Sequence, residues 1–235
     1  MKDIESGQID RLEDMLAKAG NIVVITHMKP DGDALGSSTA MYHYLKSIGK
    51  ECRIVIPDPN PSNLDFLLDQ DTRKDLRIYE AYPISTAAAI KESDLIICMD
   101  FNAFHRTDTL EPLLLESAQP KILIDHHLSP DSKQFSLVFS ETEVSSASEL
   151  LFHILMHTSQ ISHKASRIPA AAAVALIVTD DFFRNRFGSE AEFFGKDFVR
   201  SGSTEVVETD GETVQTGEAF PAEGAGGFDG DDGNQ

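Results

Sequence analysis

The sequence predicts an α/β protein with a doubly wound, mainly parallel sheet. Short apolar segments rich in β-branched residues alternate along the 235 residues with segments whose apolar residues recur every three or four positions. Strands that are apolar on both sides are typical of parallel sheets, because helices cover both faces of such sheets. The content of 41% hydrophobic residues fits a globular chain and excludes a fibrous or wholly disordered one.

The first third of the chain supplies the first two strands. A helix is expected before Gly20, since apolar residues recur at spacings of three and four from Ile9 to Leu16. Residues 22–26 (IVVIT) are β-branched and apolar on both sides, which is typical of a buried parallel strand. A polar loop leads to a helix expected at residues 34–48, and residues 53–57 (RIVIP) form the next strand.

Three further strands and a helix follow. The strands are expected at residues 94–100 (DLIICMD), 121–125 (KILID) and 135–139 (FSLVF), with the last toward the edge of the sheet. Residues 144–156 have a helical period. The apolar run AAAVALIVT precedes Asp180, and no internal repeat is found.

Composition excludes several classes of partner. With 20 Lys and Arg against 39 Asp and Glu, the net charge is −19, so we expect no binding of long DNA or of a membrane surface. A phosphorylated substrate remains compatible if bound cations supply positive charge. The longest apolar run, residues 170–178, is too short for a membrane span, and Cys52 and Cys98 form no CxxC pair. We expect a cytoplasmic protein in a reducing compartment.

The chain changes character near its end. Residues 189–235 are acidic and rich in glycine, without a periodic apolar pattern. Such a segment buries too little apolar surface to offset its ordering entropy. We therefore expect a folded domain at residues 1–188 and a disordered acidic tail at residues 189–235.

Acidic residues and histidines follow four of the apolar segments. In open α/β sheets, ligands bind at the carboxyl ends of the strands, so these residues should gather at one edge. The candidates are His27, Asp31 and Asp33 after the first strand, Asp100 after residues 94–99, Asp125, His126 and His127 after residues 121–124, and Asp180 after the apolar run 170–178.

This set of side chains predicts a metal centre. Clustered carboxylates raise one another's pKa unless cations neutralise them. Histidine nitrogens and aspartate oxygens without thiolates suit Mn²⁺, with Mg²⁺ or Co²⁺ as substitutes. Six of these side chains would be enough to bind two ions about 3.5–4 Å apart. Asp100, which follows a central strand, is the expected bridge between the ions.

Simpler interpretations exist for single residues. Asp33 alone would be a helix N-cap, and Asp31 alone would be a turn residue. Asp181 could replace Asp180 as the last ligand. Arg106 could pair with phosphate oxygens or be a surface loop residue. The remaining histidines are expected at the surface: His43, His105, His163, and His153 and His157, which follow Glu149 on the last predicted helix.

Four segments together resemble a known family. THMKPDGDALGSS, IICMDFNAFHR, LIDHHLSP and SSASELLFHIL are similar to the successive motifs of RecJ-like DHH phosphoesterases. Within that family they most resemble the bifunctional oligoribonuclease/PAP phosphatase (nanoRNase) branch, where PAP is 3′-phosphoadenosine 5′-phosphate. The resemblance covers about residues 5 to 183.

The resemblance implies a Rossmann-like DHH domain that hydrolyses phosphate esters with two Mn²⁺ ions. It implies that Asp125 supports the DHH turn, that His127 acts at the substrate phosphate, and that the substrates are short RNA, PAP, or linear and cyclic dinucleotides. The implied ligands of one ion are His27, Asp31 and Asp100, and those of the other are Asp33, Asp100, His126 and Asp180.

The sequence departs from the family near its end. Asp181 and Phe182 stand where the family has Thr and Gly, and we expect the second (DHHA1) domain to be lacking, through a truncation or reading-frame change in the source gene. Two other functions stay open: a cyclic or linear dinucleotide phosphodiesterase or an inorganic pyrophosphatase on the same metal core, and an inactive remnant that binds metal or nucleotide. The sequence also leaves open whether the chain forms a homodimer. A nicotinamide-binding domain is disfavoured, because the first strand is not followed by G-x-G-x-x-G.

Overall fold

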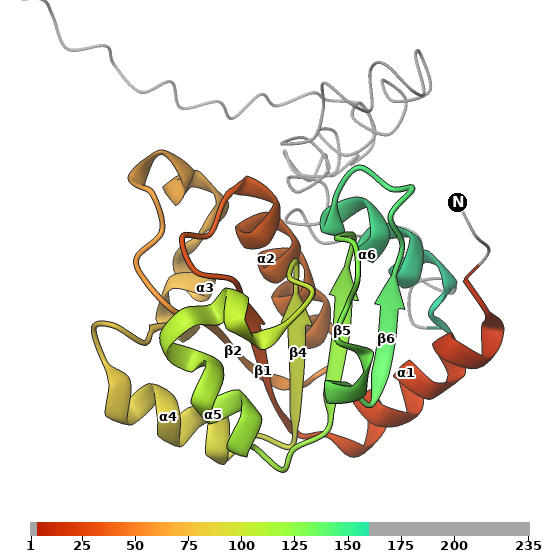
Figure 1. The fold of residues 1–235 in the computed structure, drawn as a ribbon, viewed down its shortest axis with the longest axis horizontal. Coiled ribbons are helices and arrows are strands. Elements are labelled where there is room, and N and C mark those ends of the chain that lie inside the picture. The colour runs from red at the N-terminus through yellow and green to blue at the C-terminus, as the bar shows by residue number, and fades with distance from the viewer. Residues whose placement is uncertain (1–3, 160–235) are drawn as a thin grey trace, which may run out of the picture. The chain divides into compact units, whose positions relative to one another are not determined.

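A computed structural model describes residues 4–159 of the chain (Figure 1). These residues form a six-stranded sheet with the order β3-β2-β1-β4-β5-β6, in which every neighbouring pair is parallel. The predicted α/β fold class is thereby confirmed. The strands are β1 (Asn21–Thr26), β2 (Glu51–Ile56), β3 (Leu76–Ile78), β4 (Leu95–Met99), β5 (Lys121–Asp125) and β6 (Leu137–Ser140).

Helices connect the strands. The α-helices are α1 (Ser6–Lys18), α2 (Gly32–Ser47), α3 (Gln70–Asp75), α4 (Pro83–Lys91), α5 (Glu111–Glu116) and α6 (Ala147–His157), and the 3-10 helices are η1 (Ser62–Leu67), η2 (Phe104–Leu110) and η3 (Ser132–Gln134). From β1 the chain builds outward through β2 and β3, and then returns to the other side of β1 to place β4, β5 and β6. The strand order therefore reverses between β1 and β4, which is where ligands bind in sheets of this kind.

The sheet separates two hydrophobic cores. Alternate residues of β1 enter different cores, Ile22 and Val24 on one face and Val23 and Ile25 on the other. Helices α1, α2 and α6 cover the first face, and α4, α5 and η2 cover the second. Figure 1 shows α4 and α5 together on one side of the sheet. Burial on both faces explains why the strands are apolar throughout.

The three central strands end at the same level. Thr26 at the end of β1 is in register with Met99 at the end of β4. Met99 is in turn in register with Ile124 near the end of β5. The residues that follow these strands are therefore brought side by side.

Several boundaries differ from the sequence-based expectation. The second helix begins at Gly32 rather than at residue 34, because Asp31 is its N-cap and accepts hydrogen bonds from the N–H groups of Asp33 and Ala34. The interpretation of Asp33 as the N-cap is therefore wrong. The last helix begins at Ala147 rather than at residue 144. The edge position predicted for the strand near residues 135–139 is confirmed for β6.

Some elements were not predicted at all. The segment between β2 and β4 holds η1, α3, the three-residue strand β3 and α4. Strand β3 is too short for a periodic signal, and its pairing with β2 stabilises it. Helix α4 begins with Pro83 in its first turn, where a missing N–H costs nothing.

Two further expectations concern the protein's environment. None of the helices in residues 4–159 combines the length and apolar character that crossing a bilayer needs. Cys52 and Cys98 are buried and unpaired, and burial raises the pKa of both thiols. The domain end at residue 188 and the acidic tail lie outside the described residues.

Candidate metal centre

The carboxyl ends of β1, β4 and β5 bring together most of the predicted ligands. His27 follows β1, Asp100 follows β4, and Asp125 ends β5 ahead of His126 and His127. Because the three strands end in register, residues about 25 and 75 positions apart in sequence become neighbours. The centre lies at the reversal point of the strand order.

Asp100 occupies the middle of this group. It is only 2% exposed, and its carboxylate lies between two imidazoles, with Oδ2 3.7 Å from Nε2 of His27 and Oδ1 3.4 Å from Nε2 of His126. Among the described residues, Oδ1 is buried without a hydrogen-bond partner. A buried carboxylate oxygen without a partner is costly, and a cation would satisfy it.

The backbone at Asp100 is strained. Its φ is +64°, in the left-handed region that residues other than glycine seldom adopt, although aspartate adopts it more readily than most. The N–H of Asp100 still donates to the carbonyl of Ile124, so the residue stays attached to the sheet while its side chain turns. Strain of this kind persists where the surroundings enforce it, and it is concentrated at functional sites.

The three central groups are electrostatically coupled. Burial alone would raise the pKa of Asp100, but His126 and His27 hold it below its ordinary value. Burial alone would lower the pKa of His27, yet Asp100 raises it. Asp100 likewise raises the pKa of His126. The carboxylate therefore stays charged and available as a ligand.

Two sets of ligand atoms share Asp100. In one set, atoms of His27, Asp31 and Asp100 lie within 4.8 Å of one another, and in the other, atoms of Asp100, His126 and His127 do so. The Nδ1 of His27 donates to the carbonyl of Met28, which leaves Nε2 free to bind a cation. These nitrogen and oxygen donors fit a divalent cation of the Mn²⁺ class.

Asp33 is held differently from the other candidates. Its carboxylate accepts hydrogen bonds from the N–H of Ala147 at 2.7 Å, and from the N–H and Oγ of Ser148 at 2.9 and 2.6 Å. Its Oδ2 also lies 3.6 Å from Nε2 of His126. Burial and the charge of Asp100 raise its pKa, and the hydrogen bonds from Ser148 and Ala147 oppose that rise. Asp33 thus joins α2, the centre and the first turn of α6.

Sequence reasoning missed the part that Ser148 plays. The only available signal was indirect: Ser146 and Glu149 have the spacing of a capping box, which marks a helix start whose N–H groups need acceptors. The distant acceptor, Asp33, is 115 positions away from Ser148. That pairing is visible only in the folded chain.

Asp125 fixes the geometry of the DHH turn. It is completely buried, and its carboxylate accepts a hydrogen bond from the N–H of His127 at 3.1 Å. Its Oδ1 lies 2.7 Å from Nδ1 of His127, and Nδ1 must be the donor because a carboxylate only accepts. This contact orients the imidazole and directs Nε2 away from Asp125.

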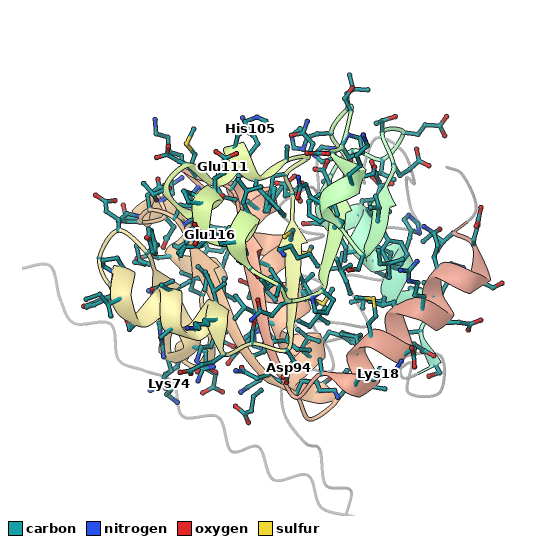
Figure 2. The ribbon with its side chains drawn as sticks, turned by 60° about the horizontal axis from the view of Figure 1, so that its bottom comes forward. Lys18, Lys74, Asp94, His105, Glu111 and Glu116 are labelled. Carbon is teal, nitrogen blue, oxygen red and sulfur yellow. The ribbon has the colours of Figure 1, made fainter. Side chains whose placement is uncertain are left out.

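The remaining candidate residues lie around the centre or outside the described part of the chain. The carbonyl of Arg106 accepts from the N–H of Met28, which brings η2 against the loop after β1. His105 is exposed, as expected, and Figure 2 shows it at the opposite end of the molecule from Asp94. Glu149 is buried rather than on the solvent face. Asp180, Asp181 and His163 lie outside the described residues.

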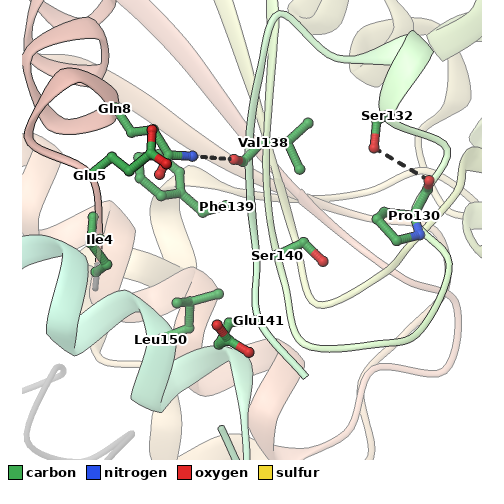
Figure 3. Close-up of a pocket in the computed structure, with 10 residues that line it drawn as sticks. All are labelled: Ile4, Glu5, Gln8, Pro130, Ser132, Val138, Phe139, Ser140, Glu141 and Leu150. Atoms are coloured by element: carbon green, nitrogen blue, oxygen red, sulfur yellow. Dashed lines mark hydrogen bonds between the residues drawn. The ribbon is translucent and has the colours of Figure 1, made fainter. Parts of the chain in front are cut away.

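A pocket of about 400 Å³ lies beside the centre rather than over it. Figure 3 shows its walls, which come from the start of α1, from β6, from α6 and from the loop after the DHH turn. Gln8 on α1 donates to the carbonyl of Val138 at 2.9 Å and so covers part of the β6 edge. The candidate ligands are not among the lining residues.

The chain matches a known protein family over most of its length. The model of the DHH family, N-terminal domain, matches residues 21–179, which include every candidate ligand before Asp180. The chain belongs to the DHH family. The resemblance in the motifs is thereby confirmed.

Individual relatives of this DHH-family chain are named for different activities. It is 28% identical over 202 residues to the cyclic-di-AMP phosphodiesterase GdpP of Geobacillus thermodenitrificans, covering 83% of this chain and 30% of the relative. It is 44% identical over 63 residues to the bifunctional oligoribonuclease and PAP phosphatase NrnA of Thermus thermophilus, covering 27% of this chain and 19% of the relative. The chain thus spans less than a third of either relative's length.

A solved structure is also similar. An exopolyphosphatase-related protein from Bacteroides fragilis has a TM-score of 0.74 and 32% sequence identity, over 87% of this chain and 59% of that one. This similarity supports the parallel α/β architecture as well as the family.

Proposed function

We propose that this chain carries the metal centre of a manganese-dependent phosphoesterase that hydrolyses short oligoribonucleotides, PAP, or both. The observation that carries the proposal is the buried carboxylate of Asp100, which lies between Nε2 of His27 and Nε2 of His126 and whose Oδ1 has no hydrogen-bond partner in residues 4–159. One carboxylate between two sets of candidate ligands suits a two-metal centre.

Each ligand would have a defined place. His27, Asp31 and Asp100 would hold one ion, and Asp33, Asp100 and His126, with Asp180 as proposed from the sequence, would hold the other. When bound, two divalent cations supply Lewis acidity to the phosphoryl oxygens and lower the pKa of water.

The remaining groups would act on the substrate. Asp125 holds the imidazole of His127 through Nδ1 and leaves Nε2 of His127 free. This Nε2 would contact the scissile phosphate or protonate the leaving oxygen. Arg106, whose backbone joins the loop after β1, would pair with phosphoryl oxygens.

A second candidate is hydrolysis of cyclic or linear dinucleotides. The similarity to GdpP, and to the cyclic-di-AMP phosphodiesterase PdeA of Listeria monocytogenes, extends over 83% of this chain, whereas the similarities to NrnA relatives cover 27%, 59% and 63%. An inorganic pyrophosphatase and an inactive metal-binding remnant are the remaining outcomes to be separated by experiment.

The test is hydrolysis, with and without Mn²⁺, of pApA, PAP, cyclic di-AMP and pyrophosphate by the full chain. We expect turnover of pApA or PAP that depends on Mn²⁺. The variant Asp100→Ala should lose Mn²⁺ binding and turnover together, while Asp10→Ala, at an exposed position on α1, should retain both. Mn²⁺-dependent turnover by Asp100→Ala would refute the bridging role, and Mn²⁺ binding without turnover of any substrate would identify a remnant.

The domain boundary and the cellular context belong to the same proposal. We place the end of the phosphoesterase domain near residue 188, and limited proteolysis with mass spectrometry tests that position. Fractionation of cells tests the expected cytoplasmic location. Light scattering of the purified chain distinguishes a monomer from a homodimer.

A further inference from the structure

Two loops of the centre share a five-residue pattern. Residues 27–31 read HMKPD and residues 127–131 read HLSPD, so each loop has a histidine, an apolar residue, one intervening residue, proline and aspartate. The intervening residue has a positive φ in both loops, +50° at Lys29 and +58° at Ser129. The match is too short to count as a sequence repeat, yet the two loops share this positive φ directly after their apolar residue.

The apolar residue of each loop is unusually exposed. Leu128 is 75% exposed and Met28 is 36% exposed, and each directly follows a histidine of the centre. A single exposed apolar side chain is ordinary on a protein surface. Two exposed apolar side chains at matched positions, on loops that flank Asp100 from β1 and from β5, indicate a common function.

Both loops are fixed to the segment that follows β4. The N–H of Met28 donates to the carbonyl of Arg106 at 2.9 Å. The side-chain amide of Asn102 donates to the carbonyl of Leu128 at 2.8 Å, and the carbonyl of Asn102 accepts from the N–H of Asp131 at 2.9 Å. The backbones that carry the two apolar side chains are therefore preorganised.

We propose that Met28 and Leu128 form an apolar rim that contacts the nucleoside part of a nucleotide whose phosphate lies at Asp100 and His127. The proposal rests on the proposed function and deepens it, because it names the residues that would recognise the nucleoside part of the substrate. Carboxylates and imidazoles select the phosphate, but an apolar rim gains nothing from inorganic phosphate or pyrophosphate. It gains from the face of a base or the carbon edge of a ribose, which it removes from water.

The experiment compares Leu128→Ser and Met28→Ser with the control Ile84→Ser. Ile84 is 87% exposed on α4, which Figure 1 shows toward the amino ends of the strands. Binding of AMP and of inorganic phosphate in the presence of Mn²⁺ is measured by calorimetry, and KM and kcat are measured with pApA. Because Leu128 is exposed, its replacement should not disturb folding, and Leu128→Met serves as the conservative variant.

We expect Leu128→Ser to weaken AMP binding and to raise KM for pApA by about fivefold, with kcat within about twofold, since an apolar contact acts equally in ground and transition states. Met28→Ser should act in the same direction and less strongly, because Met28 offers less exposed surface. Phosphate binding should not change in either variant, and Ile84→Ser and Leu128→Met should match the wild type.

Three results would overturn the rim. They are AMP binding that is no tighter than phosphate binding in the wild type, an equal loss of AMP and phosphate binding in the serine variants, and serine variants indistinguishable from Ile84→Ser. Failure of the proposed function looks different, because the wild type would then turn over no substrate. The calorimetric comparison decides the rim in that case too.

Discussion

At the scale of single residues, the centre depends on side chains that are held in place by second groups. The backbone of Asp100 is strained, but its N–H remains bonded to β5. Asp125 orients His127, and the carbonyl of Met28 orients His27. Such supporting contacts fix ring orientation and ligand basicity, so their loss weakens metal binding even when every ligand is present.

Ser148→Ala tests one of these supporting contacts. It removes the 2.6 Å hydrogen bond from Oγ to Asp33 and leaves the backbone N–H of residue 148 in place. We expect the Mn²⁺ concentration for half-maximal activity to rise about tenfold, in the range found for supporting groups of metal ligands. A Mn²⁺ titration of initial rates measures it.

The matched control is Ser85→Ala on α4, a serine whose Oγ bonds only to a carbonyl of the preceding turn among the contacts described. It should leave the Mn²⁺ dependence unchanged. An unchanged Mn²⁺ dependence in Ser148→Ala itself would show that Asp33 needs no help from α6.

At the scale of elements, the start of α6 links the centre to the helical layer. Ser146 accepts from the N–H of Glu149, and Glu149 Oε2 accepts from the N–H and Oγ of Ser145. The N–H groups of Ala147 and Ser148 donate to Asp33. The first turn of α6 is therefore satisfied partly by nearby residues and partly by the carboxylate of Asp33 from α2.

Glu149→Gln tests the contribution of this first turn to stability. Burial alone would raise the pKa of Glu149, but His153 and the hydrogen bonds from Ser145 lower it to about 2 from an ordinary 4.5. A depressed folded-state pKa stabilises the protein above the unfolded value, and this contribution disappears as the pH falls from about 4.5 to about 2. At about 1.4 kcal/mol per pKa unit, it amounts to at most about 3.5 kcal/mol.

Urea unfolding at pH 6, 4 and 3 measures this effect. The difference in unfolding free energy between wild type and Glu149→Gln should be largest at pH 6 and should shrink toward pH 3. Glu116→Gln, at an exposed position on α5, should show no such trend. A difference independent of pH would contradict the assignment of the low pKa to Glu149.

At the scale of the whole molecule, the sheet topology creates the centre. The strand order reverses between β1 and β4, and candidate ligands from the ends of β1, β4 and β5 meet there. Ions held by three strands and by α2 would tie together elements from both halves of the sheet. Metal binding should therefore stabilise the fold as a unit.

Thermal unfolding in Mn²⁺ tests this linkage without any measurement of activity. At a Mn²⁺ concentration about 100 times its Kd, we expect stabilisation by about 2.7 kcal/mol, which corresponds to a rise in Tm of roughly 5–10 °C for a domain of this size. Asp100→Asn should fold, because asparagine tolerates a positive φ, but its Tm should not respond to Mn²⁺. An equal response in both proteins would place the metal elsewhere.

The sequence by itself determined the parallel α/β class, the principal strands and most of the residues that gather at the candidate centre. It could do so because buried parallel strands are apolar throughout and because ligands follow strand ends. The same local patterns could not place β3, which owes its existence to pairing with β2.

Only the tertiary structure decided which groups form hydrogen bonds with one another and which of them are buried. Asp31 rather than Asp33 caps α2, Asp33 bonds to a helix more than a hundred residues away, and Glu149 is buried. The bonds from Ala147 and Ser148 to Asp33 depend on where the start of α2 meets the start of α6. Periodicity and spacing record neighbours along the chain, whereas this contact joins elements that are distant in sequence.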